Sequence, residues 1–366
     1  MASKQYTFYY CYKTFMKTRK TTSSPTQPQI AKYAPRPKFQ IAIAIMLAVL
    51  GLGSVGLNFY LIYHKNTVIV KPELAVCAGK MIEFRDQGQS LIKTLRLVNL
   101  DHESSQLEPM KARINTMIDD EKSTGRITDA SVYFCKLGDG SYISINDQAR
   151  YRPGSIAKIP LMIYFLSLEE QKPGILETSV LYDIPLNIQR HDTYNESDMK
   201  AGQSYKLREL MQKMIVNSDN IATSLLIARV QDGPLYQKVF KTLGLTPIDL
   251  SSAEYTITTS ECSRFLGVLY NATYLNEKHS QYALDLLSKA TFADGITKNL
   301  PKTLTIAHKF GEGGGTKHPE FSETSIIYQD DDPYLLTIMT KGLDTKVQAQ
   351  AISEISSLIY DCVKGR

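Results

Sequence analysis

The chain has 366 residues, of which 43% are hydrophobic, so it can bury a large core in one or two domains. Its net charge of +5 arises at the N-terminus, because residues 1–40 hold eight basic residues and no Asp or Glu. The remainder has 34 basic residues (42 minus 8) against 37 acidic ones. We expect no nucleic-acid partner, because such a protein would have its basic surface on the folded domain.

The first 63 residues are typical of a membrane anchor. Residues 1–40 predict a basic, disordered cytoplasmic tail, and the uncharged run 41–63 has the length of a transmembrane helix, which needs about 20 residues. A buried core helix and a cleaved signal sequence are the alternatives, but the run exceeds a signal-peptide core and lacks a clear small-residue cleavage site. The basic flank favours a cytoplasmic N-terminus. The sequence therefore predicts a single-pass protein of the cell membrane with its folded part outside the cytoplasm.

Four of the five cysteines fall in this expected extracytoplasmic part. Cys77, Cys135, Cys262 and Cys362 can form two disulfides in three alternative pairings, or they can remain buried thiols. Their spacing matches no metal site and leaves both possibilities open.

The chain after the anchor divides into a stalk and one large domain. Residues 64–106 predict a stalk or collar with short helical stretches such as 83–95. Apolar residues at helical spacing then predict a surface helix over 107–122. Residues 129–145 contain two β-rich runs around the turn Gly138-Asp139-Gly140, which indicates an antiparallel hairpin.

A buried helix is predicted from Ser155, because residues 156–168 are apolar almost all round. Further helices are expected over 207–214, 220–230, 260–274 and 347–363, and strands over 304–309, 323–328 and 334–340. This order predicts an α/β (α+β) fold, in which helices flank an antiparallel sheet and an all-helical lobe is inserted. Residues 107–366 would form this domain, with the substrate cleft between sheet and lobe.

Ser155 and Lys158 are candidates for a catalytic pair. Three residues apart at a helix start, they project from the same face and can share a proton. The helix N-terminus favours the serine alkoxide, and a desolvated lysine can lose its charge and act as a base. A four-residue pattern of this kind arises by chance, but an apolar helix is an unusual place for a lysine without partners.

Two later motifs can supply those partners. Ser218-Asp219-Asn220 lies at a helix junction, and Lys309-Phe310-Gly311 ends a predicted strand. The alternatives are a helix N-cap for the first motif and an exposed strand-end lysine for the second.

In this order, SxxK, SDN and K-x-G resemble the signature of penicillin-recognising serine enzymes, and of class A β-lactamases in particular. The likeness extends from about residue 107 to the C-terminus. It implies an acylated nucleophile at Ser155, with Lys158 as its proton partner and Ser218 as a proton shuttle to the leaving nitrogen. It further implies substrate binding by Asn220, Lys309, Gly311 and Glu312, with Asn220 on the substrate amide and Lys309 on the carboxylate. The oxyanion hole would be formed by the backbone N–H groups of Ser155 and Glu312, and no metal or cofactor is implied.

The chain departs from the family pattern at two places. Phe310 replaces the usual Thr or Ser, which removes a hydroxyl that would contact the substrate carboxylate. The loop after the SDN helix is short and lacks the Glu-x-x-Leu-Asn pattern that activates the deacylating water. Glu254 is the nearest acidic candidate for that role, and a loop or helix-cap residue is its alternative.

Several functions are compatible with these residues. The first is acyl transfer from a β-lactam or related amide followed by hydrolysis. The second is a D-Ala-D-Ala carboxypeptidase acting on peptidoglycan, and the third is a non-catalytic envelope-binding domain. A zinc site that includes His308 and His318 is disfavoured, because no HxxxH or comparable ligand spacing occurs.

Overall fold

The computed structural model describes residues 84–85, 91–92, 95–97, 103–183, 197–230, 233–247, 255–315, 317–330 and 332–365. The expected cytoplasmic tail and transmembrane segment lie outside these ranges, and so does Glu254. Within them, no helix combines the length and apolar character needed to cross a membrane.

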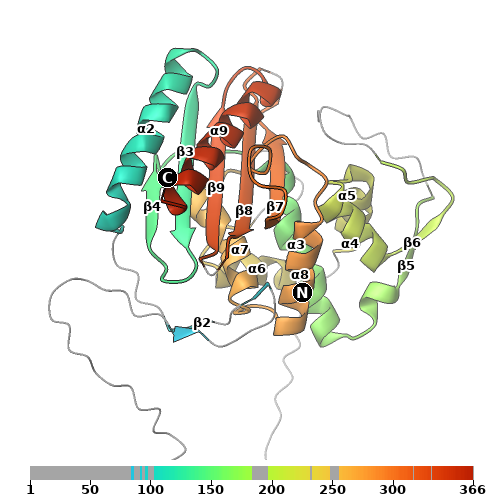
Figure 1. Cartoon of the computed structure of the whole chain (residues 1–366). Coiled ribbons are helices and arrows are strands. Elements are labelled where there is room, and N and C mark those ends of the chain that lie inside the picture. The colour runs from blue at the N-terminus through green and yellow to red at the C-terminus, as the bar shows by residue number, and fades with distance from the viewer. Residues whose placement is uncertain are drawn as a thin grey trace, which may run out of the picture. The chain divides into compact units, whose positions relative to one another are not determined.

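A five-stranded antiparallel sheet organises the domain (Figure 1), with the strand order β4-β3-β9-β8-β7. The strands are β3 (Asp129–Lys136), β4 (Tyr142–Ile145), β7 (Thr305–Gly313), β8 (Glu320–Tyr328) and β9 (Tyr334–Lys341). The predicted hairpin is confirmed as β3 and β4, and β3 also pairs with β9, where Val132 lies opposite Ile338. Strand β7 forms the far edge of this sheet.

Helices α2 (Glu108–Ser123) and α9 (Thr345–Val363) cover one face of the sheet. Their apolar stripes meet the alternate side chains of the strands, so that Ile114, Phe134, Ile338 and Ile352 are fully buried in one cluster. At about 25 cal/mol per Å² of apolar surface, such burial is the main force that holds the layers together. Both helices were predicted, and α2 was predicted from the helical spacing of its apolar residues.

The helical lobe and its partners pack on the other face. They are α3 (Lys158–Gln171), α4 (Leu207–Val216), α5 (Asn220–Ile227), α6 (Gly233–Thr242), α7 (Thr259–Tyr270) and α8 (Glu277–Ser288). The 3-10 turn η2 (Gly154–Ala157) leads into α3, and the turn η3 (Ile175–Glu177) with the short pair β5 (Ser179–Leu181) and β6 (Ser204–Lys206) connects α3 to α4. A further 3-10 turn, η1 (Ser105–Leu107), precedes α2. Helix α3 is buried on all sides from Lys158 to Leu166, as its sequence predicts.

The structure of the segment that was predicted to be a stalk, residues 64–106, differs from that prediction in two respects. The helical stretch 83–95 is wrong, because β1 (Phe84–Arg85) and β2 (Leu95–Leu97) pair as short antiparallel strands. Ile92 is fully buried in the same apolar cluster as α3, and the Tyr328 hydroxyl donates to the Leu91 carbonyl at 2.8 Å. Part of this segment therefore belongs to the folded domain.

Cys262 and Cys362 are thiols, so two disulfides among the four expected cysteines are not formed. Burial raises the pKa of the Cys262 thiol to about 12 and also raises that of Cys362. Cys262 therefore behaves as a small buried apolar side chain.

Candidate active site

Ser155 lies in the turn η2, directly before α3, and that turn is held against strand β7. A Cβ atom on Gly311 would approach the Pro153 carbonyl oxygen to 2.0 Å and the Ser155 nitrogen to 2.9 Å. Gly154 has a φ of +52°, and its Cβ would lie 2.1 Å from the Glu312 carbonyl oxygen. The two backbones can approach this closely only because both residues are glycines.

A carboxylate anchors the loop that leads to Ser155, which the sequence did not indicate. The Arg152 backbone N–H donates to Glu320 Oε2 at 2.5 Å, and its guanidinium lies 3.6 Å from Oε1. Glu320 belongs to β8, so the loop is held by the strand next to β7.

Lys158 is buried, with 5% of its surface exposed, and it is surrounded by oxygen acceptors. Its Nζ donates to the Ser218 carbonyl at 2.6 Å, to Ser218 Oγ at 3.1 Å and to Asn220 Oδ1 at 2.7 Å. Among the hydrogen bonds between described residues, none joins Lys158 to Ser155 Oγ. In many enzymes a catalytic hydrogen bond shortens only once substrate is bound, so the placement of Ser155 one turn away still suits a catalytic pair.

The SDN motif is both a helix cap and part of the site. Asp219 caps α5, because its Oδ1 accepts from Ile221 N at 2.8 Å and Ala222 N at 3.0 Å, which confirms the N-cap alternative for this residue. Ser218 has a φ of +55°, a conformation that few non-glycine residues adopt. Ser218 and Asn220, which flank Asp219 in the sequence, both accept hydrogen bonds from Lys158 Nζ.

Lys309 is 1% exposed, so the alternative of an exposed strand-end lysine is wrong. Its Nζ donates to Ser218 Oγ at 2.9 Å and to the Phe310 carbonyl at 3.1 Å. Strand β7 continues past Lys309 to Gly313, two residues beyond the predicted motif's Gly311. Glu312 is half-buried on this extension, opposite Phe321.

The two lysines converge on one hydroxyl group. Ser218 Oγ lies 3.1 Å from Lys158 Nζ and 2.9 Å from Lys309 Nζ. A hydroxyl has two acceptor lone pairs and one proton to donate. With both lysines donating, the Ser218 proton is the one left to be given to a further acceptor. Such an arrangement can pass a proton from a base to a leaving group.

His308 lies beside Lys309 in sequence, but its side chain pairs with a carboxylate. Its Nδ1 lies 2.7 Å from Glu323 Oε1, and both side chains are buried. The other Glu323 oxygen accepts from Ile296 N at 2.7 Å. Glu323 lies on β8, so this carboxylate joins His308 of β7 to the loop that precedes β7. His308 therefore has a structural partner.

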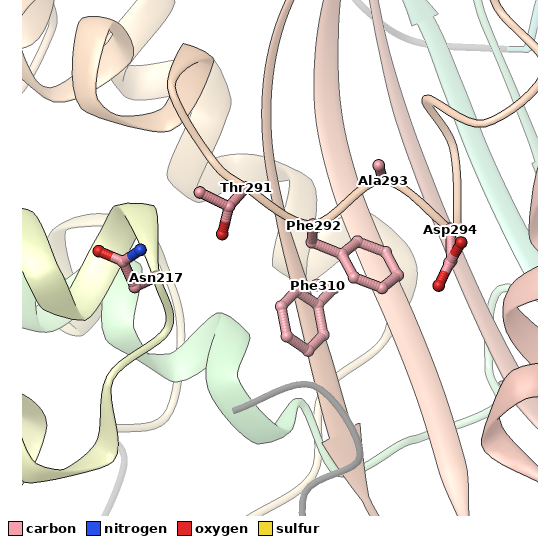
Figure 2. A pocket seen from close by; sticks show the side chains of 6 residues that line it. All are labelled: Asn217, Thr291, Phe292, Ala293, Asp294 and Phe310. Atoms are coloured by element: carbon pink, nitrogen blue, oxygen red, sulfur yellow. The ribbon is translucent and has the colours of Figure 1, made fainter. Parts of the chain in front are cut away.

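Beside the lysines lies a pocket of about 250 Å³ that the sequence did not predict. Its lining residues come from the end of α4, the loop after α8 and strand β7, and they are Asn217, Thr291, Phe292, Ala293, Asp294 and Phe310 (Figure 2). Phe310, the residue that departs from the family motif, therefore forms part of the pocket.

The model of the family described as "Beta-lactamase enzyme family" matches residues 109–363. A search of curated proteins finds no match.

Solved structures with the same fold include a PBP-A variant crystallised as its acyl-enzyme with penicillin G. It is 17% identical, with a TM-score of 0.59 over 71% of this chain and 98% of that one. A β-lactamase from Francisella tularensis is also 17% identical, with a TM-score of 0.59 over 69% and 99% of the two chains. A class A β-lactamase from Mycobacterium abscessus is 19% identical, with a TM-score of 0.58 over 69% and 98%. The structural likeness supports the fold, the family match covers more than half of the chain, and the chain belongs to the β-lactamase enzyme family.

Proposed function

We propose that this chain is a serine hydrolase that is acylated at Ser155 by a β-lactam or a related amide. The observation that supports this most strongly is the convergence of Lys158 and Lys309 on Ser218 Oγ, at 3.1 and 2.9 Å, next to the turn that presents Ser155. Burying two lysines so close together without a functional role would destabilise the fold, because each buried charge needs compensating polar partners.

In the proposed reaction, Lys158 acts from its neutral form, in which Nζ gives up one of its three donated hydrogen bonds and gains a lone pair. That lone pair takes the Ser155 hydroxyl proton while Oγ attacks the substrate carbonyl carbon. The N–H groups of Ser155 and Glu312 stabilise the oxyanion. When the C–N bond breaks, Ser218 gives its proton to the leaving nitrogen and is reprotonated from Lys158. Asn220 and Lys309 orient the substrate. Hydrolysis then frees the acyl group from Ser155. Water adds to the ester carbonyl carbon, and the bond from that carbon to Oγ breaks as Oγ takes up a proton from the water.

A time course of intact mass with penicillin, together with turnover of a chromogenic cephalosporin, tests the proposal. We expect a covalent adduct that is absent in Ser155→Ala and present in Ser123→Ala, which removes an exposed serine at the end of α2. A wild-type chain that gains no adduct at high penicillin concentration would contradict the proposal and favour a non-catalytic binding domain.

The second candidate is a D-Ala-D-Ala carboxypeptidase, supported by the sequence's lack of the family's deacylation motif and by the fold shared with PBP-A. An adduct that persists, together with release of D-Ala from a peptidoglycan peptide, would favour it. Rapid loss of the adduct with steady cephalosporin turnover would favour the β-lactamase.

We also propose that residues 41–63 anchor the enzyme in the cell membrane with residues 1–40 in the cytoplasm. The support is the uncharged run and its basic flank. Membrane fractionation of the full chain, against a chain that begins at Gly79, tests this. Recovery of both in the soluble fraction would contradict it.

A further inference from the structure

The segment that leads into the Ser155 turn is held by a carboxylate from inside the sheet. Glu320, on β8, is 6% exposed, and its Oε2 accepts the Arg152 backbone N–H at 2.5 Å. Its Oε1 lies 3.6 Å from the Arg152 guanidinium. A hydrogen bond to an ionised acceptor is roughly twice as strong as one between neutral groups. One side chain therefore holds both the main chain and the side chain of the residue three positions before the proposed nucleophile.

Two glycines at the end of β7 leave room for this contact. Gly313 lies opposite Glu320 in the sheet, and a Cβ atom on it would lie 2.7 Å from the Arg152 carbonyl oxygen. A Cβ atom on Gly314 would lie 3.0 Å from Glu320 Cγ, and the φ of Gly314 is +74°. The carboxylate can reach the Arg152 main chain because neither position has a side chain.

The peptide group between Tyr151 and Arg152 is fixed at both of its polar atoms. The Tyr151 carbonyl accepts from the Ile257 N–H at 2.9 Å, and the Arg152 N–H donates to Glu320. Tyr151 itself is fully buried, and Lys341 Nζ lies 4.7 Å from the centroid of its ring. Tyr151 therefore has contacts of its own, whereas the orientation of the peptide group that follows it depends on Glu320.

The chain between this peptide group and Ser155 is short and stiff. The residue before a proline is restricted to extended conformations, which applies to Arg152, and the ring of Pro153 fixes its φ, here −71°. Gly154 follows, and a Cβ atom on it would lie only 2.1 Å from the Glu312 carbonyl oxygen. A rotation of the anchored peptide group would therefore be passed on to Ser155 instead of being absorbed on the way.

We propose that Glu320 is a positioning residue for Ser155 and acts through the Arg152 backbone N–H. This inference rests on the proposed function, because the position of Ser155 Oγ affects a rate only if that atom attacks a substrate. Without the carboxylate, the N–H turns toward another acceptor, and the turn populates positions from which Oγ does not reach the carbonyl carbon. A displacement of about 1 Å in a reacting group can reduce the rate about 100-fold, so partial loosening is measurable.

The test is the rate constant of penicillin adduct formation, measured by intact mass over a range of penicillin concentrations. Glu320→Met keeps the chain length and removes the acceptor, and we expect the rate constant at saturation to fall about tenfold. The half-saturating concentration should stay within about twofold, because Asn220 and Lys309 lie on α5 and β7 outside the altered contact. Glu320→Gln keeps an acceptor oxygen and should recover the rate constant to within about threefold of the wild type.

A purely structural role predicts a different result. Partial unfolding lowers the fraction of protein that is acylated but leaves the rate constant of the folded molecules unchanged. Glu103→Met is the matched control, because Glu103 also accepts a backbone N–H, from Ser144 at 2.9 Å, and pairs with an ammonium group, that of Lys111. It lies beside β4, at the opposite edge of the sheet from β7, so the acylation rate constant should not change.

Three outcomes overturn the proposal. The first is a wild-type rate constant in Glu320→Met, and the second is an equal loss in Glu103→Met. The third is a Glu320→Gln protein as slow as Glu320→Met, because the charge and not the acceptor would then be responsible.

Amide hydrogen exchange separates this proposal from the proposed function. The Ile156 N–H donates to the Pro153 carbonyl at 3.1 Å, and its exchange reports on the turn without any substrate. Relative to the amide of Cys262 inside α7, it should exchange about tenfold faster in Glu320→Met and at the wild-type ratio in Glu103→Met. If the wild type gains no adduct while this exchange result holds, the hydrolase function is refuted and the control of the turn by Glu320 stands. If the wild type is acylated and the exchange ratio is unchanged in Glu320→Met, the positioning role is refuted and the hydrolase function stands.

Discussion

Replacing Gly311 with alanine tests whether the contact between β7 and the Ser155 turn is required for the site. The added Cβ would lie 2.0 Å from the Pro153 carbonyl oxygen, and ordinary contact begins near 3.4 Å, so the two backbones must separate by about 1.4 Å (3.4 minus 2.0). A displacement of about 1 Å in a reacting group can reduce the rate about 100-fold. We therefore expect Gly311→Ala to slow acylation at Ser155 by about 100-fold and to lower the free energy of unfolding by about 1–3 kcal/mol.

The assay is a stopped time course of penicillin adduct formation by intact mass, with stability measured in urea. Gly267→Ala is the matched control, because Gly267 lies inside α7 and its added Cβ would meet no atom within 4 Å. This change should raise stability by about 0.5–1 kcal/mol and leave the acylation rate unaltered.

A Gly311→Ala protein that acylates within about threefold of the wild type would refute this reasoning. Such a result would mean that the strand and the turn can move apart without loss of the oxyanion hole. Equal losses of stability in the two glycine variants would also contradict it, since only one of them meets a steric clash.

Substitutions at three further residues test other parts of the domain. Asp219→Ala should cost about 1 kcal/mol of stability by removing the α5 cap and should slow acylation, and Asp219→Asn, which retains a capping oxygen, should recover most of both. Lys309→Met should slow acylation about 100-fold while the urea midpoint stays the same or rises, because a buried charge is replaced by an apolar chain; a lower midpoint with normal acylation would contradict this. Burial and the neighbouring Glu354 raise the pKa of Glu121 from 4.5 to about 7. Glu121 therefore stays protonated to a higher pH in the folded state than in the unfolded state. Stability should then fall by at most about 3 kcal/mol as the pH rises from about 4.5 to 7, and Glu121→Gln should flatten the urea-derived profile; an unchanged profile would show that this carboxyl does not titrate there.

The sequence identified the parts of the site that depend on local pattern. Ser155 and Lys158 are three residues apart, and an apolar run follows them, so the helical turn at Ser155 and the burial of Lys158 could be predicted. The sheet could be predicted as well, because its strands alternate or are continuously apolar between clear turns. Helices α6 and α8 were missed although apolar residues recur in them at helical spacing, as in Leu235, Tyr236 and Val239.

What the sequence could not provide were contacts between distant segments. Phe292 and Phe310 are separated by a loop and part of a strand, and no local pattern indicates that their rings stack. The anchoring of Arg152 by Glu320 likewise joins residues that only the strand order brings together. Phe310 was recognised only as a departure from the family motif, whereas the structure assigns it a place in a pocket.

The close contact between the Ser155 turn and β7 also determines how the site can open. Gly154 is pressed against the Glu312 carbonyl and Gly311 against that of Pro153, so a local hinge motion of the turn has no free space on the strand side. Motion of the Ser155 turn toward the strand requires the sheet edge to move as well, and motion away from the strand breaks the contacts of Arg152 with Glu320. The amide proton of Ile156, which donates to the Pro153 carbonyl at 3.1 Å, should then exchange with solvent at nearly the rate of global unfolding. Ser155 would then belong to the slowest-exchanging part of the fold, in contrast to active sites that are carried on mobile loops.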